Sequence, residues 1–160
     1  MTMADINKVA ELVRGIKFAL VTFVNHEGHL HSAPMTTQDE EFNGTVWFIG
    51  SKSSDLVRSI PGNNQVNLGY SDTSGHNYVS INGVAELVND QAKLDELWSE
   101  GYNAFFEQGK EDPDVQLIKV VGNGAQYWEG DGKVLSFIKM TKAAITGTTA
   151  KLGETDGVKL

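Results

Sequence analysis

The amino-acid sequence predicts a mainly β protein, in which an antiparallel barrel is flanked by a few helices. Its apolar segments alternate or are rich in β-branched and aromatic residues, and short connections separate them. Long helical crossovers, which a parallel sheet needs, are missing between the early segments. With 160 residues and no repeat or linker, the chain has the length of one domain. We expect this domain to span residues 1–150 and residues 151–160 to form a flexible C-terminal tail.

The first third of the chain combines one helix signal with three strand signals. Apolar residues recur at helical spacing over 5–14. The ranges 18–25 and 30–38 have the composition of strands and follow each other through a Gly-containing turn. Asn43-Gly44 is typical of a two-residue hairpin and opens a strand over 45–50.

The remaining two thirds contain both helix and strand signals. The predicted elements are a short helix over 53–60, strands over 65–70 and 78–87, a helix that begins after Asn89 or Asp90 and includes Tyr102, and strands over 115–121 and 125–128. We interpret Gly122-Asn123-Gly124 as the turn between the last two strands. The range 134–138 fits either a strand or a helix.

Composition restricts the possible partners. The chain has 13 Lys and Arg against 21 Asp and Glu, a formal net charge of −8. This balance disfavours a nucleic-acid-binding surface and a polybasic membrane patch, since both need a basic surface. No apolar run approaches the roughly 20 residues that cross a bilayer, and the first residues lack the features of a signal peptide. We therefore expect a cytoplasmic protein without nucleic-acid or membrane partners.

Several kinds of reactive site are excluded or disfavoured. The chain has no cysteine, which excludes disulfides, thiolate zinc sites, iron–sulfur clusters and cysteine nucleophiles. His26, Glu27, His29 and His31 form a cluster of metal-binding residue types, but they lie in a predicted turn and lack the ligand set of a zinc site. We expect no metal site. Motifs of serine nucleophiles and zinc proteases are also missing, so the sequence assigns no catalytic residue.

A polar cluster, Ser51-Lys52-Ser53-Ser54, follows an apolar strand and opens the short helix. Hydroxyls, an ammonium group and the unpaired N–H groups of a helix start could together hold a phosphate. In the alternative interpretation, Ser53 or Ser54 caps the helix and Lys52 is solvated. Asp55 favours this alternative, because a carboxylate in the first turn competes with an incoming anion.

The tryptophans differ in their expected roles. Trp47 and Trp98 lie among apolar residues, in a strand and on a helix stripe, and are expected in the core. Trp128 ends a strand beside a loop, a position that suits contact with a ligand or a second subunit.

Short motifs along nearly the whole chain, from about residue 5 to residue 147, also occur together in one known family. They are His31-Ser32-Ala33-Pro34-Met35, Val46-Trp47-Phe48, the range 78–85, Asp90-Gln91-Ala92-Lys93, Asp112-Pro113-Asp114, Ala125-Gln126-Tyr127-Trp128 and the range 142–147. In this order and spacing they resemble the general stress protein branch of the pyridoxamine 5′-phosphate oxidase-like family, the FMN-binding split barrels.

The resemblance implies a split barrel that forms a homodimer and holds FMN in grooves at the subunit interface, with FAD or another flavin left open. It places contacts to the flavin ring on Met35, Thr36 and Thr37 and on Phe48, Ile49 and Gly50. It places the phosphate on the second strand and on Ser51, Lys52, Ser53 and Ser54. Trp128, together with Tyr78, is expected to approach the ring from the partner subunit.

Two positions depart from the family pattern. Ala33 stands where relatives usually carry an arginine, and Leu56 stands where they tend to carry a lysine. Both residues normally meet the phosphate, and charged hydrogen bonds to phosphate are strong. Unless Lys52 or Arg58 substitutes for them, we expect reduced FMN affinity or a different ligand.

The leading hypothesis is a stress-associated flavin-dependent oxidoreductase or a flavin carrier. The alternative is a non-enzymatic ligand-binding or sensing module of the same fold that has weakened or lost FMN binding. A deazaflavin or a haem is a third option within this fold.

Overall fold

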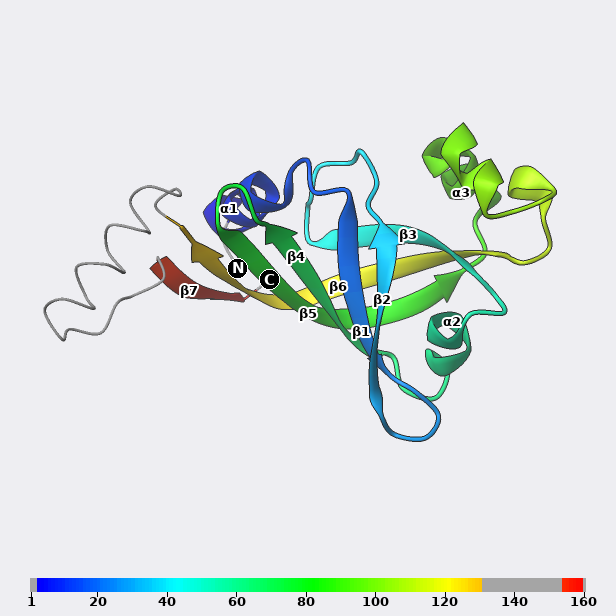
Figure 1. Cartoon of the computed structure of the whole chain (residues 1–160), viewed down its shortest axis with the longest axis horizontal. Helices are drawn as coiled ribbons and strands as arrows, with labels where there is room; N and C mark the ends of the chain where they lie inside the picture. Colours follow the sequence, from blue (N-terminus) through cyan, green and yellow to red (C-terminus); the bar gives the residue numbers. More distant parts are fainter. Residues whose placement is uncertain (1–2, 131–153, 160) are drawn as a thin grey trace, which may run out of the picture.

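Seven antiparallel strands form one curled sheet in the computed structural model, which describes residues 3–130 and 154–159 (Figure 1). The strands are β1 (Phe18–Val24), β2 (Leu30–Thr36), β3 (Thr45–Ser51), β4 (Gln65–Asp72), β5 (Asn77–Val88), β6 (Val115–Glu129) and β7 (Glu154–Lys159). The helices are α1 (Met3–Val13), α2 (Asp55–Ser59) and α3 (Gln91–Leu97), with single 3₁₀ turns η1 (Glu100–Ala104) and η2 (Gly109–Glu111).

The hydrogen-bonded order is β2-β1-β4-β5-β6-β3, and β7 pairs with β6 beside this path. The end strands β2 and β3 have no ladder between them, although they approach each other: a Cβ added to Gly50 of β3 would lie 3.3 Å from Met35 Cε of β2. We call the gap between these two strands the seam. It leaves the barrel open along one line, which confirms the predicted antiparallel split barrel.

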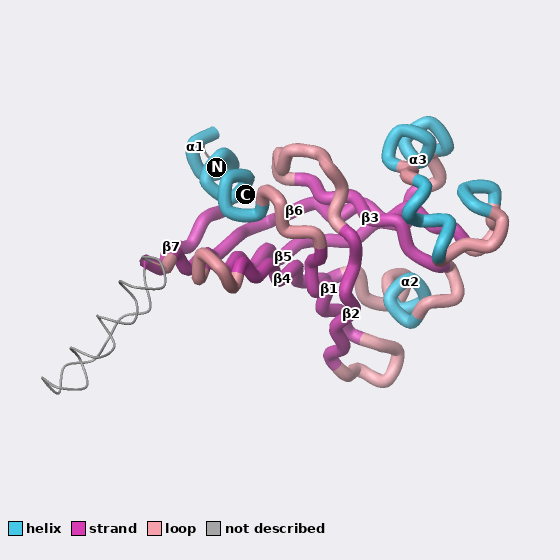
Figure 2. The backbone as a smooth tube through the Cα atoms, turned by 45° about the horizontal axis from the view of Figure 1, so that its top comes forward, coloured by secondary structure: helices cyan, strands magenta, loops and turns pink. Residues whose placement is uncertain are grey.

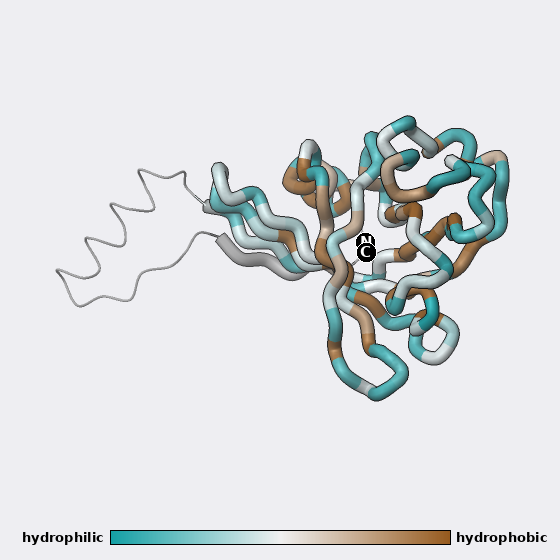
Figure 3. Tube along the Cα trace, turned by 45° about the vertical axis from the view of Figure 1, so that its right-hand side comes forward, coloured by the Kyte–Doolittle hydropathy of each residue, from teal (hydrophilic) through white to brown (hydrophobic). Residues whose placement is uncertain are grey.

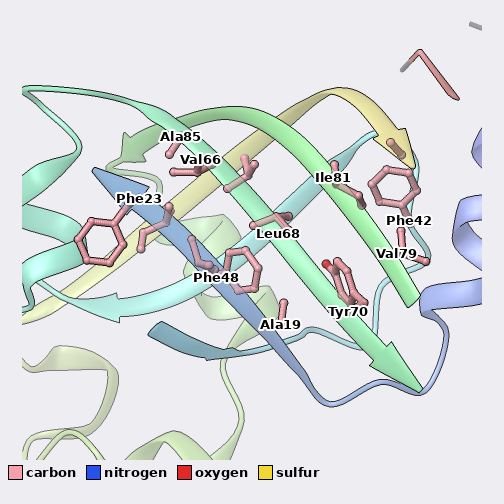
Figure 4. Close-up of a cluster of buried hydrophobic side chains, with 14 of the residues drawn as sticks. Ala19, Phe23, Phe42, Phe48, Val66, Leu68, Tyr70, Val79, Ile81 and Ala85 are labelled. Carbon is pink, nitrogen blue, oxygen red and sulfur yellow. The ribbon is translucent and has the colours of Figure 1, made fainter. Parts of the chain in front are cut away.

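Apolar side chains from most strands fill the barrel interior. Phe48, Leu68 and Ile81 are fully buried there, among the residues drawn in Figure 4. Helix α1 contributes Val9 to this core and lies at one end of the sheet, whereas α2 and α3 lie at the other (Figure 2). A second cluster, built around Ile49, forms under α3 and η1. Hydrophobic residues follow the strands, and the tip of the β1–β2 hairpin is hydrophilic (Figure 3).

Two connections differ from the sequence prediction. Asn43-Gly44 does not join a hairpin, because β3 pairs with β6 and not with β2. The prediction of a turn at Gly122-Asn123-Gly124 is also wrong, since these residues lie inside β6. There Asn82 pairs with Gly124 and Gly83 pairs with Gly122, so Asn123 is an extra residue in a β-bulge.

Two further elements differ from the prediction. Helix α3 ends at Leu97, where Trp98 adopts an extended conformation and packs its ring 5.3 Å from that of Tyr102. Within the C-terminal tail expected from the sequence, Glu154–Lys159 form β7, which pairs with β6. The ranges 134–138 and 142–147 lie outside the described residues.

Candidate functional site

The seam brings β2 close to β3 and to the start of α2. His31, Ala33 and Met35 pair with buried residues of β1, so they lie on the inner face of β2. His31 Nδ1 lies 3.7 Å from Asp55 Oδ2 in the first turn of α2, and Met35 reaches Gly50. Ala33 lies between these two contacts and therefore faces the segment that joins β3 to α2.

That segment, residues 51–54, is called here the serine loop. Ser54 is the N-cap of α2: its Oγ accepts a hydrogen bond from Val57 N at 3.2 Å and donates one to Ser51 O at 2.7 Å. Ser54 N–H also donates to Ser51 O. The capping interpretation of Ser54 is therefore confirmed.

Asp114, immediately before β6, binds two residues of the serine loop. Ser53 donates to its carboxylate twice, from the backbone N–H to Oδ1 and from the hydroxyl to Oδ2, both at 2.9 Å. Lys52 N–H donates to the Asp114 carbonyl oxygen at 2.7 Å. Of the donors that the sequence pattern offers to a phosphate, the two of Ser53 are thus engaged by a carboxylate of the same chain.

Lys52 is exposed and lines a hollow of about 350 Å³ between the serine loop, the start of α3 and η2. Asp90, Glu111 and Asp112 line the same hollow together with Lys110. Lys52 is therefore placed beside a largely acidic surface.

The other residues predicted to contact the flavin ring differ in burial and in hydrogen bonding. Phe48 and Ile49 are buried in the two apolar clusters, so only their backbone groups can meet a ligand. Thr36 ends β2 opposite Phe18, on the outer face. Thr37 donates its N–H to Lys17 O and its hydroxyl to Ile16 O, which fastens the end of β2.

Tyr78 and Trp128 form a directly opposed cross-strand pair between β5 and β6. Trp128 also pairs with Thr155 of β7, so the pair lies at the end of the sheet that β7 extends, and α2 lies far from β7 in Figure 1. Lys8 of α1 braces this end through a 2.6 Å ion pair with Glu129. This hydrogen-bonded pair raises the pKa of Lys8, against the opposing effect of partial burial. Within one chain, the structure therefore does not bring Tyr78 and Trp128 to the serine loop.

An apolar surface on the outer face of the sheet was not identified from the sequence. Phe18, Leu20 and Leu30 are 61%, 53% and 73% exposed, and Pro34 is exposed beside Leu20. These four residues are called the outer apolar band. By strand register, Tyr78 and Trp128 lie on the same face. A signal was present: the segment 18–24 is apolar on both alternating faces, which is typical of a strand covered on both sides.

Among the residues that the structure describes, no group of three or more His, Asp or Glu is placed to hold a metal ion. The same part of the chain contains no helix that is both long and apolar enough to span a membrane.

Comparison with known proteins identifies the family. The family model described as pyridoxamine 5′-phosphate oxidase like matches residues 4–151. The chain belongs to this family.

Solved structures of related proteins share the fold. A protein assigned as general stress protein 26 from Jannaschia sp. CCS1 is 27% identical, with a TM-score of 0.75 over 99% of this chain and 100% of that one. The general stress FMN/FAD binding protein from Xanthomonas citri is 25% identical, with a TM-score of 0.70 over 82% of this chain and 93% of that one. No match is found among the curated proteins.

As a member of the pyridoxamine 5′-phosphate oxidase-like family, this chain has the split barrel, but fewer donors are free for a phosphate at the expected place than its sequence pattern offers. Ala33 offers no charge or hydrogen bond from the inner face of β2. Leu56 is 4% exposed and packs into the core, so no cation occupies its position either. Both donors of Ser53 are already bound to Asp114.

Proposed function

We propose that this chain forms a homodimer that binds a flavin between its two copies, and that it acts as a flavin-dependent oxidoreductase or a flavin carrier connected with stress. Family membership and the similarity to the Xanthomonas citri FMN/FAD binding protein support a flavin. FMN is the flavin that the resemblance implies, and the altered phosphate positions lead us to expect weak binding. The cytoplasmic location expected from the sequence is part of this proposal, as is the lack of nucleic-acid and membrane partners.

The outer apolar band is the observation that carries the proposal. Phe18, Leu20 and Pro34 lie in neighbouring positions of β1 and β2 and are exposed in the single chain, and Leu30 lies beyond the hydrogen-bonded Thr22–Ser32 pair. Such apolar patches mark surfaces that a partner covers. A two-fold dimer buries the same patch from both copies. Because β2 also forms one wall of the seam, a second copy on the band would complete a groove beside it. Trp128 of the partner subunit is then expected to reach that groove.

The seam offers a flavin ring a suitable environment. Strand β3 is hydrogen-bonded along only one edge to β6 within the described residues, so alternate N–H and C=O groups face the seam without a strand partner. Such groups can bind the polar edge of a ring, while the half-buried Met35 supplies apolar surface. A bound flavin supplies the electron-transfer chemistry, and the protein supplies orientation and exclusion of water.

The visible spectrum of the purified protein, followed by titration with FMN and riboflavin, tests flavin binding. We expect a flavin absorption band that stays with the protein, or quenching of flavin fluorescence on titration. A colourless protein that leaves the fluorescence of both flavins unchanged would contradict the proposal.

A second candidate is the non-enzymatic binding or sensing module. Ala33, Leu56 and the carboxylate at the serine loop favour it, because they remove the usual phosphate contacts. Mass spectrometry of the ligand released by denaturing the purified protein distinguishes the two. A flavin supports the leading proposal, and another small molecule supports the module.

A further inference from the structure

We infer that the flavin site of this chain prefers a flavin with an uncharged tail to one that ends in a phosphate, and that Asp114 sets this preference. The inference rests on the proposed function, because it specifies the ligand of the same site. Three features of the serine loop and its surroundings lead to it.

First, several donors of the serine loop, including both of Ser53, have acceptors already. Ser53 gives both its N–H and its hydroxyl to the Asp114 carboxylate, in a two-point geometry similar to that offered to a phosphate. Lys52 N–H is bound to the carbonyl oxygen of Asp114, and Ser54 is used in capping. A phosphate at this place must therefore displace a carboxylate that the fold itself supplies.

Second, this displacement breaks a structural connection. Asp114 precedes β6, whose first residue, Val115, pairs with Ser51 at the end of β3. The Asp114 contacts thus fasten the serine loop to the start of β6 across 61 residues of sequence. A phosphate that takes the Ser53 donors leaves the carboxylate without them and loosens this junction.

Third, the charges around the loop repel a dianion. Asp114 and Asp55 lie on two sides of it, and Asp55 is also the nearest acidic partner of His31. Lys52 lines the hollow that contains three carboxylates, Asp90, Glu111 and Asp112, against one further cation, Lys110. Arg58 lies in the last turn of α2. At Ala33 and Leu56, where the family resemblance leads us to expect cations, this chain has apolar groups. An uncharged ribityl tail avoids this repulsion and leaves the Ser53–Asp114 contacts intact.

The test compares riboflavin and FMN, which share the ring and ribityl chain and differ in the phosphate. Dissociation constants are measured by quenching of flavin fluorescence with the full chain and two variants. Asp114→Asn removes the charge and keeps one oxygen to accept from Ser53. Asp39→Asn is the matched control, because it removes an exposed carboxylate beyond the other end of β2.

We expect the unaltered chain to bind riboflavin at least as tightly as FMN. Asp114→Asn should tighten FMN binding about tenfold, the scale of one charged contact, and leave riboflavin binding within about twofold. Asp39→Asn should leave both constants unchanged. Tighter binding of FMN than of riboflavin by the unaltered chain, or an unchanged FMN-to-riboflavin ratio in Asp114→Asn, overturns the inference and leaves the proposed function standing.

The comparison of riboflavin and FMN on the unaltered chain needs no variant, so it tests the preference for an uncharged tail even if Asp114→Asn does not fold. Quenching of neither flavin overturns the proposed function and this inference with it. The two failures are therefore distinguishable.

Discussion

Ser54 shows how much a single side chain contributes at the residue scale. Its hydroxyl accepts from Val57 N–H and donates to Ser51 O, so it satisfies an otherwise unpaired donor of α2 and shapes the serine loop. Because α2 has five residues, its own hydrogen bonds are few and the cap is a large part of its local stability.

Replacing Ser54 with alanine removes this cap. We expect Ser54→Ala to lower the free energy of unfolding by about 1 kcal/mol, measured by urea denaturation. Ser99→Ala is a matched control, since Ser99 precedes η1 and makes no capping hydrogen bond through its side chain. An equal loss in both variants would mean that the Ser54 cap contributes nothing specific.

At the scale of elements, the β-bulge in the β5–β6 pair is an example of local geometry that depends on glycine. Asn123 is the extra residue, and the backbone of Gly83 approaches β6 closely: a Cβ added there would lie 2.5 Å from Val121 O. The bulge changes the register between two long strands and so sets which residues of β6 face the core.

A methyl group at Gly83 should disturb this pairing. We expect Gly83→Ala to lower the free energy of unfolding by about 1–3 kcal/mol because β6 must shift to relieve the clash. Gly69→Ala on β4 is the control, since the nearest atom to its added Cβ lies at 3.8 Å, an ordinary contact. Equal stability of the two variants would contradict the proposed close approach.

The loop between β4 and β5 depends on one carboxylate. Hydrogen bonds from Gly75 N–H, from the Asn77 amide and from Ser74 N–H lower the pKa of Asp72. A lowered pKa in the folded state means that the stabilisation is complete above the unfolded value and is lost as the pH falls through the folded value.

Acid should therefore loosen this loop. We expect amide hydrogen exchange at Ser74 and Gly75, corrected for its intrinsic pH dependence, to lose protection as the pH falls below about 4. In Asp72→Asn the protection should not depend on pH in this range. Protection that is independent of pH in the unaltered chain would exclude this role for the carboxylate.

At the scale of the whole molecule, the outer apolar band lies on the outer face of β1 and β2, and the seam runs along the edge of β2 that faces β3. One strand therefore connects the proposed dimer interface with the proposed flavin groove, and loss of one should weaken the other. Exposed Leu20 is near the middle of the band, with Pro34 as its cross-strand neighbour.

A charge in the band should separate the two copies. We expect Leu20→Glu to sediment as a monomer and to bind flavin at least tenfold more weakly, because burying an unpaired carboxylate is costly. Phe105→Glu is the control: Phe105 is 75% exposed near η1, outside the band. A Leu20→Glu protein that remains dimeric would place the interface elsewhere.

The sequence alone determined the local elements of this protein. The content of β-branched and aromatic residues located β1, and alternation of apolar residues located β5. Ser54 and Asp90 were recognised as candidate helix caps, and ordered short motifs identified the family. These features depend on residues near each other in the chain, where spacing reports conformation directly. The flavin contacts assigned to residues such as Thr37 and Trp128 stay predictions.

Only the tertiary structure decided which strands pair and which polar groups are free. The Asn43-Gly44 signal could not show that β3 pairs with β6, because strand pairing depends on distant residues. Likewise, the composition of the serine loop suggested donors for a phosphate, and Asp114, 61 residues away, takes two of them. A donor that is already hydrogen-bonded is not free to bind a ligand, whichever part of the chain supplies the acceptor. The ligands that a loop can bind therefore depend on the whole fold that surrounds it.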